Sequence, residues 1–205
     1  TTEKFFYYRI CDNSKRDVTI DEIYALIGKN YCLNDIQIKF LKDLEFKIEF
    51  DNIKPITKNI EFVKTLIKEN ERVILISDMY LRIDMIRNLL TKVDKIFETI
   101  PVYVSCEYNA KKHDGILFEK IKTLENVEFT SWHHYGDNEI ADFKQPLKLG
   151  IYATLFNFYK LKTFEQIYIN SDKNNLQYYK ILALIRNLCV NEMESPLEEL
   201  GISFG

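Results

Sequence analysis

The sequence predicts an α/β protein in which helices flank a parallel β-sheet. From Arg72 onward, short runs rich in β-branched residues alternate with segments of helical periodicity, which is the pattern of β-α units around a parallel sheet. The segment 73–77, Val-Ile-Leu-Ile-Ser, is apolar on both faces almost to its end, as is typical of a central parallel strand. The expected strands are 72–77, 101–105, 132–136 and 150–155.

The first sixty or so residues predict a helical subdomain. Thr19 and Glu22 have the spacing of a capping box that opens a helix, and Gly28 is well placed to end it. Apolar residues then recur at helical spacing and predict a second, longer amphipathic helix. These residues are Leu33, Ile36, Phe40, Leu44 and Ile48.

Further helices are predicted between the strands and after the last strand. Helical segments connect the strands at 81–93, 114–124 and 139–149. The tail from Tyr159 contains a segment, 175–190, whose apolar positions run nearly all round a helix. We therefore expect a β-α core followed by a helical C-terminal extension.

Composition narrows the possible functional classes. The chain has 205 residues and is 46% hydrophobic, which is enough for a folded core. Its 28 basic and 31 acidic residues are mixed, and the net charge is -3, so no basic stripe is offered to nucleic acid or anionic lipid. No apolar run approaches the roughly 20 residues that span a bilayer. We expect neither a nucleic-acid partner nor a membrane span.

The four cysteines predict neither a disulfide framework nor a zinc site. Cys11, Cys32, Cys106 and Cys189 lie far apart and form no Cys-x-x-Cys pair, so we expect free buried thiols in a reducing compartment. The N-terminus has no signal-peptide layout, which also favours a cytoplasmic location. Because the sequence has no initiator Met and ends on Ile-Ser-Phe-Gly, we expect it to be part of a longer chain.

Polar residues follow three of the predicted strands, at the edge where α/β proteins bind ligands. Loops and helix N-termini converge at the carboxyl ends of parallel strands, so side chains there lie close together. The residues in question are Ser77 and Asp78 after the first strand, Ser105, Lys111 and Lys112 after the second, and Asp137, Asn138 and Asp142 after the third. A hydroxyl, a lysine and a carboxylate pair are therefore expected at one rim.

This combination suits a phosphate group and a magnesium ion. The Ser77 hydroxyl can donate to phosphate oxygens, and a lysine ammonium neutralises negative charge. Asp137 and Asp142 can hold Mg²⁺ through oxygen ligands and water. Singly, Ser77 or Asp78 is explained as a helix cap and the lysine as a solvated surface group. Their shared position behind strand ends favours a phosphoryl-transfer site that lacks only its nucleophile.

The histidines do not predict a metal site. His133 and His134 are adjacent on a predicted strand, so their side chains point to opposite faces and cannot chelate one ion together. We expect one of them to pack in the core and the other to lie behind the site. His113 is expected to be only a neighbour of the lysine.

Three segments resemble the haloacid dehalogenase (HAD) superfamily, especially the hydrolase-like domains found with bacterial surface-polysaccharide biosynthesis proteins. They are 73–81 (VILISDMYL), 106–118 (CEYNAKKHDGILF) and 132–153 (WHHYGDNEIADFKQPLKLGIYA). The resemblance implies a Rossmann-like (HAD-like) parallel sheet with flanking helices and a helical cap subdomain. It divides the chain into a cap-like subdomain at 1–60, a core at 61–158 and a C-terminal helical extension at 159–205.

The resemblance also assigns roles. The second motif of the family is a strand ending in Ser or Thr, matched by Ser77, and the third is a lysine, matched by Lys112. The fourth is an acidic pair, Gly-Asp-x-x-x-x-Asp, matched by Asp137 and Asp142 as metal residues. Asp78 and Asn138 are secondary candidates. The implied activity is Mg²⁺-dependent hydrolysis of a phosphate monoester, such as a sugar phosphate, in carbohydrate or cell-envelope metabolism.

The first motif of the family, Asp-x-Asp-x-Thr after an apolar strand, is not found in this sequence. Asp78 does not replace it, because Tyr80 stands where the family has a second acid. The resemblance places the missing strand just before Thr1, so the intact protein is expected to be an enzyme and this chain alone to be nearly inactive. The alternative is a non-catalytic Rossmann-like module that serves as an interaction or scaffolding domain beside a glycosyltransferase.

Overall fold

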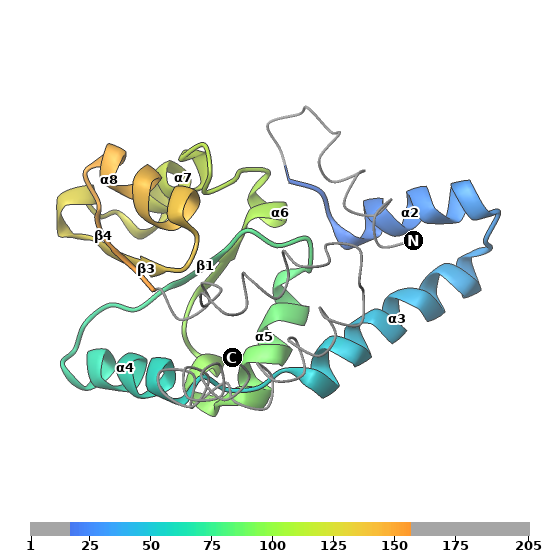
Figure 1. The fold of residues 1–205 in the computed structure, drawn as a ribbon, viewed down its shortest axis with the longest axis horizontal. Helices are drawn as coiled ribbons and strands as arrows, with labels where there is room; N and C mark the ends of the chain where they lie inside the picture. The colour runs from blue at the N-terminus through green and yellow to red at the C-terminus, as the bar shows by residue number, and fades with distance from the viewer. Residues whose placement is uncertain (1–16, 157–205) are drawn as a thin grey trace, which may run out of the picture.

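The computed structural model describes residues 17–156, which have a mixed α/β architecture (Figure 1). Its elements, in chain order, are α2 (Ile20–Tyr31), α3 (Asp35–Asn52), α4 (Thr57–Lys68), β1 (Leu75–Ser77), α5 (Ile83–Val93), η1 (Lys95–Glu98), β2 (Val102–Val104), α6 (Ser105–Tyr108), α7 (Ile116–Glu125), η2 (Phe129–Ser131), β3 (His133–Gly136), η3 (Glu139–Lys144), α8 (Gln145–Leu149) and β4 (Tyr152–Leu155). The predicted extension at 159–205 lies outside the described residues. Among the helices of this part, none is long and apolar enough to cross a membrane.

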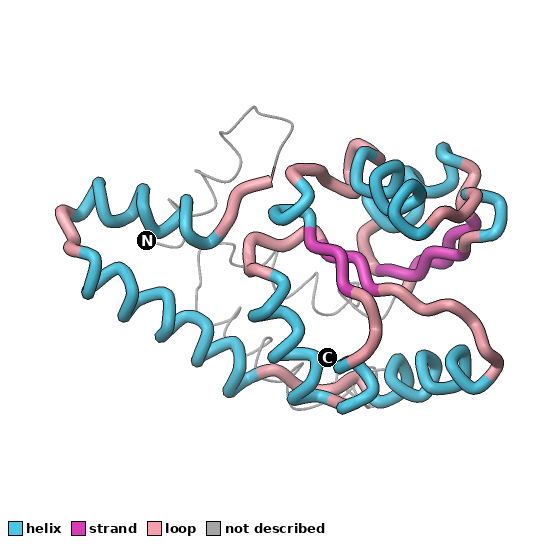
Figure 2. Tube along the Cα trace, turned by 180° about the vertical axis from the view of Figure 1, so that it is seen from behind, coloured by secondary structure: helices cyan, strands magenta, loops and turns pink. Residues whose placement is uncertain are grey.

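The strands form two short parallel ladders instead of the single sheet that the sequence predicted. β1 pairs with β2, with Leu75 opposite Val102, and β3 pairs with β4, with His133 opposite Tyr152. Each strand lies inside its predicted range but is only three or four residues long. Figures 1 and 2 show the ladders as neighbours, with α7 and α8 on one side and α4 and α5 on the other. The single sheet that was expected is therefore interrupted between β1 and β3.

The helix α2 begins at the predicted capping box. The Thr19 N–H donates to Glu22 Oε2 at 2.8 Å, and the Glu22 N–H donates to Thr19 Oγ1 at 3.2 Å. The helix does not end at Gly28, where a Cβ would collide with Ile38 of α3, so this glycine allows the two helices to approach each other. Cys32 ends the helix in the left-handed conformation (φ 52°) and is an exposed free thiol, not the buried one expected.

The helix α3 is the second helix predicted, but the predicted apolar face is exposed. Ile36 is 81% exposed and Phe40 63%, and Leu44 and Ile48 are exposed as well. The side chains that pack against the core come from another part of the helix surface. They are Ile38, Leu41, Phe46 and Phe50. The prediction was wrong about the face because this helix carries apolar residues on more than one side, and spacing alone does not select among them.

Three other elements differ from the predicted pattern. The helix α4 was not predicted, and it runs across residue 60, where the cap-like subdomain was expected to end. The helix α7 begins at Ile116, whose N–H donates to the side chain of Asp114. The predicted helix at 139–149 is divided into a π-helical turn, η3, and the short helix α8, because Pro146 fits only the first turn of a helix.

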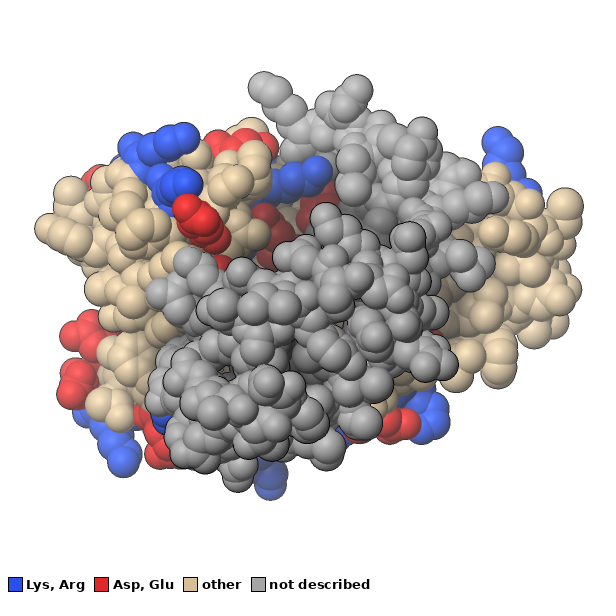
Figure 3. All heavy atoms as spheres, viewed as in Figure 1, with Lys and Arg blue, Asp and Glu red and all other residues tan. Residues whose placement is uncertain are grey.

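The main hydrophobic core lies where α2, α3 and α5 meet the first ladder. Its buried members are Ile20, Ile23, Tyr24, Leu81, Ile86, Leu89, Val102, Val104 and Cys106. Over the described part of the face in Figure 3, acidic and basic side chains are intermixed, as the composition suggested.

Substitution on α2 and α3 should separate core residues from exposed ones. Ile23→Ala should lower the free energy of unfolding by about 2–5 kcal/mol, because Ile23 is buried and its truncation leaves a cavity. Ile36→Ala should change it by less than about 0.5 kcal/mol, because this side chain contacts mainly solvent. Urea unfolding followed by circular dichroism measures both. A loss of similar size in Ile36→Ala would mean that the outer face of α3 is packed.

Candidate functional site

A pocket of about 560 Å³ lies at the carboxyl ends of β1 and β3. Its lining includes six of the residues that the sequence predicted for this rim: Ser77, Asp78, Lys112, Asp137, Asn138 and Asp142. Ser105 and Lys111 were expected at the same rim and do not line the pocket. Asn59 of α4, Tyr135 of β3 and Phe156 also line it and were not predicted. The structure thus brings the predicted residues together, while their chemical roles stay predictions.

The lysine of the site is Lys112 and not Lys111. The Lys112 residue is only 9% exposed, its Nζ forms an ion pair with Asp142 Oδ1, and it lines the pocket, which Lys111 does not. The Lys112 N–H donates to both carboxylate oxygens of Asp78, at 2.9 and 3.1 Å. The segment that carries the lysine is therefore fastened to the end of β1.

Asp142 interacts with three donors in the pocket. Lys112 Nζ and His134 Nε2 share its Oδ1, the latter at 2.9 Å, and the Asn138 N–H donates to its Oδ2 at 3.0 Å. Burial raises the pKa of Asp142, but the hydrogen bond from His134 and the positive charge of Lys112 outweigh burial and hold the pKa well below its usual range. Asp142 is therefore ionised at neutral pH.

His134 is the histidine that lies behind the site, a place that the sequence predicted for one of the two histidines without deciding which. Burial lowers its pKa, and the hydrogen bond to Asp142 opposes this only in part, so the ring is neutral near pH 7 and Nε2 carries the donated proton. His133 points the other way and is exposed, with Nε2 2.8 Å from Thr154 Oγ1, so the expectation of a core-packed partner was wrong. The available signal was the alternation of a strand, which puts His134 and Gly136 on one face.

Gly136 makes room for Asp142. A Cβ at position 136 would collide with the Asp142 carboxylate, so no larger residue fits without moving it. The turn between them is set by Asn138, whose Oδ1 accepts the N–H groups of Ile140 and Ala141 at 3.0 and 2.9 Å. The π-helical turn η3 then carries Asp142 back toward β3, and such turns are frequent at functional sites. The Gly-Asp-x-x-x-x-Asp spacing thus has a packing reason.

Asp78 is at the pocket, as expected of a secondary candidate, whereas Ser105 is not. Asp78 lines the pocket and accepts the Lys112 N–H; burial raises its pKa, and that hydrogen bond partly opposes the shift. Ser105 is fully buried away from the pocket. Its Oγ donates to Asp17 Oδ2 at 2.6 Å and accepts the Met79 N–H at 2.9 Å, so it ties together the segments beyond β1 and before α2.

The two predicted metal residues are not equivalent. Asp142 Oδ1 is already shared by two donors, whereas Asp137 is exposed at the pocket. Within residues 17–156, no group of three His, Cys, Asp or Glu side chains is arranged to hold a metal. Mg²⁺ commonly binds one or two carboxylates and completes its shell with water and phosphate oxygens. The donor chemistry of Asp137 fits such an ion, while Asp142 serves Lys112.

No protein-family model matches this chain, and no curated protein matches it either.

Removing the charge of Asp142 should unfold part of the population. Asp142→Asn leaves the Lys112 ammonium buried without its counter-ion, so the free energy of unfolding should fall by about 3–5 kcal/mol. Asp137→Asn is the matched control, because Asp137 is exposed, and should change it by less than about 0.5 kcal/mol. Chemical denaturation measures both. Similar stability in the two variants would show that the ion pair is not structural.

Stability should fall in two separate steps as the pH is lowered. The folded-state pKa of His134 lies below its ordinary value of 6.5, so the unfolded chain binds a proton first and stability declines as the pH drops through that value. The pKa of Asp142 is lowered from 3.8, so its contribution is complete above that pH and is lost as the pH falls further. Urea unfolding between pH 8 and 2 should reveal both steps.

Two neighbouring histidines provide the control for the upper step. His134→Gln should flatten the decline near pH 6.5, whereas His133→Gln should leave it unchanged, because His133 is exposed. The same decline in both variants would contradict the assignment to His134.

Proposed function

We propose that the pocket binds a phosphate group, and that the protein is a HAD-like, Mg²⁺-dependent phosphohydrolase of the cytoplasm acting on a small phosphorylated substrate such as a sugar phosphate. The observation that carries the proposal is a buried lysine, Lys112, held by Asp142 in a pocket that Ser77 and Asp137 also line. Parallel strands ending at this pocket support a Rossmann-like, HAD-like core, because ligands of such sheets bind beyond the strand ends.

Each residue has a role in this proposal that its contacts support. The Ser77 hydroxyl donates to a phosphate oxygen, and the Lys112 ammonium neutralises the charge that develops on the transferring group. Asp142 and neutral His134 do not touch the substrate; they fix the position of the ammonium. Asp78 positions the same lysine through its backbone N–H.

The charge balance of the pocket supports a divalent cation. Asp78, Asp137 and Asp142 face one lysine, so the lining carries three carboxylates against one ammonium. A phosphate dianion entering this pocket would be repelled unless a cation or a proton offset the excess. Asp137 would hold a Mg²⁺ ion, which would supply that charge and polarise a phosphoryl oxygen.

Hydrolysis through an aspartyl-phosphate needs a nucleophilic carboxylate, which in the HAD superfamily comes from the first motif, Asp-x-Asp-x-Thr. That motif is not found in this sequence, and Asp78 is engaged with Lys112. For this chain the proposal is therefore binding of phosphate, and for a chain that also carries the motif it is hydrolysis.

A second proposal is the non-catalytic interaction module beside a glycosyltransferase. The exposed apolar face of α3, formed by Ile36, Phe40, Leu44 and Ile48, favours it, because contiguous exposed apolar residues often mark protein contacts. The two proposals differ in one measurable property, because only the phosphohydrolase proposal requires affinity for phosphate.

Titration calorimetry with inorganic phosphate tests the first proposal. With Mg²⁺ present, the double variant Lys112→Met/Asp142→Asn, which removes both members of the ion pair, should bind phosphate at least about tenfold more weakly than the unmodified chain, because a charged hydrogen bond is lost. Lys111→Met is the control and should bind normally. Equal affinity in all three proteins would contradict the role of Lys112.

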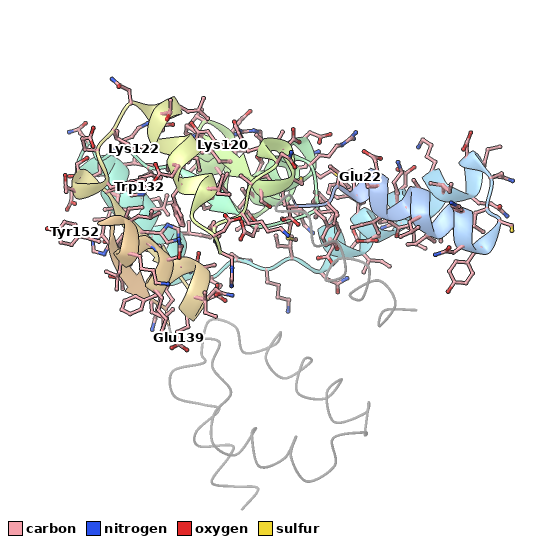
Figure 4. The ribbon with its side chains drawn as sticks, turned by 90° about the horizontal axis from the view of Figure 1, so that it is seen from above. Glu22, Lys120, Lys122, Trp132, Glu139 and Tyr152 are labelled. Atoms are coloured by element: carbon pink, nitrogen blue, oxygen red, sulfur yellow. The ribbon has the colours of Figure 1, made fainter. Side chains whose placement is uncertain are left out.

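A matched pair of variants tests whether phosphate binding depends on Mg²⁺. Asp137→Asn should abolish the gain in phosphate affinity that Mg²⁺ produces, because the ion loses its carboxylate ligand. Glu139→Gln should keep the gain, since Glu139 does not line the pocket and lies exposed at the edge of the described part of the chain (Figure 4). Absence of phosphate binding in the unmodified chain, with and without Mg²⁺, would favour the interaction module.

A further inference from the structure

The helix α3 has two apolar faces, of which residues 17–156 bury only the inner one against the main core. The outer face is formed by four large apolar side chains, all of them exposed: Ile36, Phe40, Leu44 and Ile48. Figures 1 and 2 show the hairpin of α2 and α3 projecting away from the two ladders, so α3 lies at the margin of the described part. A contiguous apolar patch in such a place marks a contact surface.

The outer face of α3 is organised as two neighbouring rows of side chains. The four apolar residues follow one another at intervals of four, so they form one continuous ridge along the helix. A second ridge lies beside it, also at intervals of four, and its exposed residues alternate in charge: Asp35, Lys39, Asp43, Lys47 and Asp51. An apolar ridge edged by alternating charges is typical of a surface that packs against another helix.

We propose that a second copy of this chain packs on the outer face of α3, with the two α3 helices antiparallel about a two-fold axis level with Leu41. In this register the apolar ridges interdigitate. Phe40 enters the space between the partner's Phe40 and the partner's Leu44. Ile36 enters the space between the partner's Leu44 and the partner's Ile48. A two-fold axis makes each of these contacts twice, because both copies contribute the same surface.

The charged ridge favours the same register. With the axis level with Leu41, Lys39 faces the partner's Asp43, and Asp35 faces the partner's Lys47. Lys39 already pairs with Asp43 of its own chain, so the contact creates a four-membered network in which the charges alternate. Shifting one helix by a single turn would instead bring Lys39 opposite the partner's Lys47, and facing like charges are strongly disfavoured.

Both ridges together select this register and predict a weak, reversible dimer. A shift of two turns would restore opposite charges, but Ile36 would then extend beyond the end of the partner's apolar ridge. The helix has 18 residues and is about 27 Å long. One pair of helices of this length buries less than the roughly 1,600 Å² of a standard interface, so we expect association in the micromolar range.

The dimer is independent of the proposed binding of phosphate. The residues that line the pocket at the carboxyl ends of β1 and β3 include none from α3, so the contact leaves that pocket open. At the low protein concentration of an unfolding experiment the two copies are separate. The outer face of α3 then contacts solvent, as its exposure indicates.

Sedimentation equilibrium of the full chain tests the proposal. The unmodified chain should dimerise reversibly at concentrations up to about 0.1 mM. Phe40→Glu should weaken dimerisation at least about hundredfold, because it places one carboxylate from each copy at the centre of the apolar contact. Leu124→Glu is the matched control and should dimerise normally. Leu124 is a large apolar residue with a similar exposure, but it belongs to α7.

Three outcomes would overturn the proposal. A single monomeric species at every concentration would leave the outer face of α3 to a different protein. Equal dimerisation of the unmodified chain and Phe40→Glu would place the contact elsewhere on the molecule. An equal loss in Phe40→Glu and Leu124→Glu would show that the effect is not specific to α3. Circular dichroism establishes that both variants are folded.

Two charge reversals test the contact between the charged ridges. Lys39→Asp and Asp43→Lys should each dimerise at least about tenfold more weakly, because residues 39 and 43 then carry the same charge in both copies. An equimolar mixture of the two variants should recover dimerisation, since one copy is negative at both positions and the other is positive. Each variant lacks the internal pair of Lys39 and Asp43, so recovery cannot come from a repaired single chain. A mixture that stays monomeric would overturn the proposal.

Discussion

The buried ion pair between Lys112 and Asp142 is the interaction on which the site depends. Two charges that leave water together are stabilised only if each remaining hydrogen-bonding position is satisfied. His134 and the Asn138 N–H complete the shell of Asp142, and Gly136 provides the space for it. The local sequence around β3 is therefore constrained by packing as much as by chemistry. Removing the charge of Lys112 or of Asp142 would leave the other charge buried without a partner.

This pairing also sets what the pocket can attract. Because Asp142 neutralises Lys112, the lysine is a positioned donor and not a surplus positive charge. Asp78 and Asp137 then determine the sign of the pocket, and the raised pKa of Asp78 means that burial already works against its negative charge. A proton on Asp78 and a cation at Asp137 are two ways to reduce the same electrostatic cost, so binding of an anion should be coupled to one or both.

The sequence predicted most of the strands and helices, and the edge of the sheet that carries the site, because hydrophobic periodicity and the ends of strands are local properties of the sequence. It placed Ser77, Asp137 and Asp142 at one edge because they follow the ends of predicted parallel strands. It was wrong about the face of α3 that meets the core, and it did not decide which of His133 and His134 lies behind the site. Each of these features depends on the elements that pack against the residue. The spacing of residues within one segment contains no information about those elements.

The ion pair has a further consequence because its members come from different ladders. Lys112 follows β2 and α6, whereas Asp142 follows β3, so their contact joins the two halves of the molecule at the pocket. Ser77 and Asp137 are likewise delivered by different ladders, and within residues 17–156 no strand pairs with both β1 and β3. Main-chain pairing holds register far more firmly than one side-chain contact, since a slip of one residue would turn every side chain to the other face. The spacing of the two ladders and the geometry of the site are thus one structural problem.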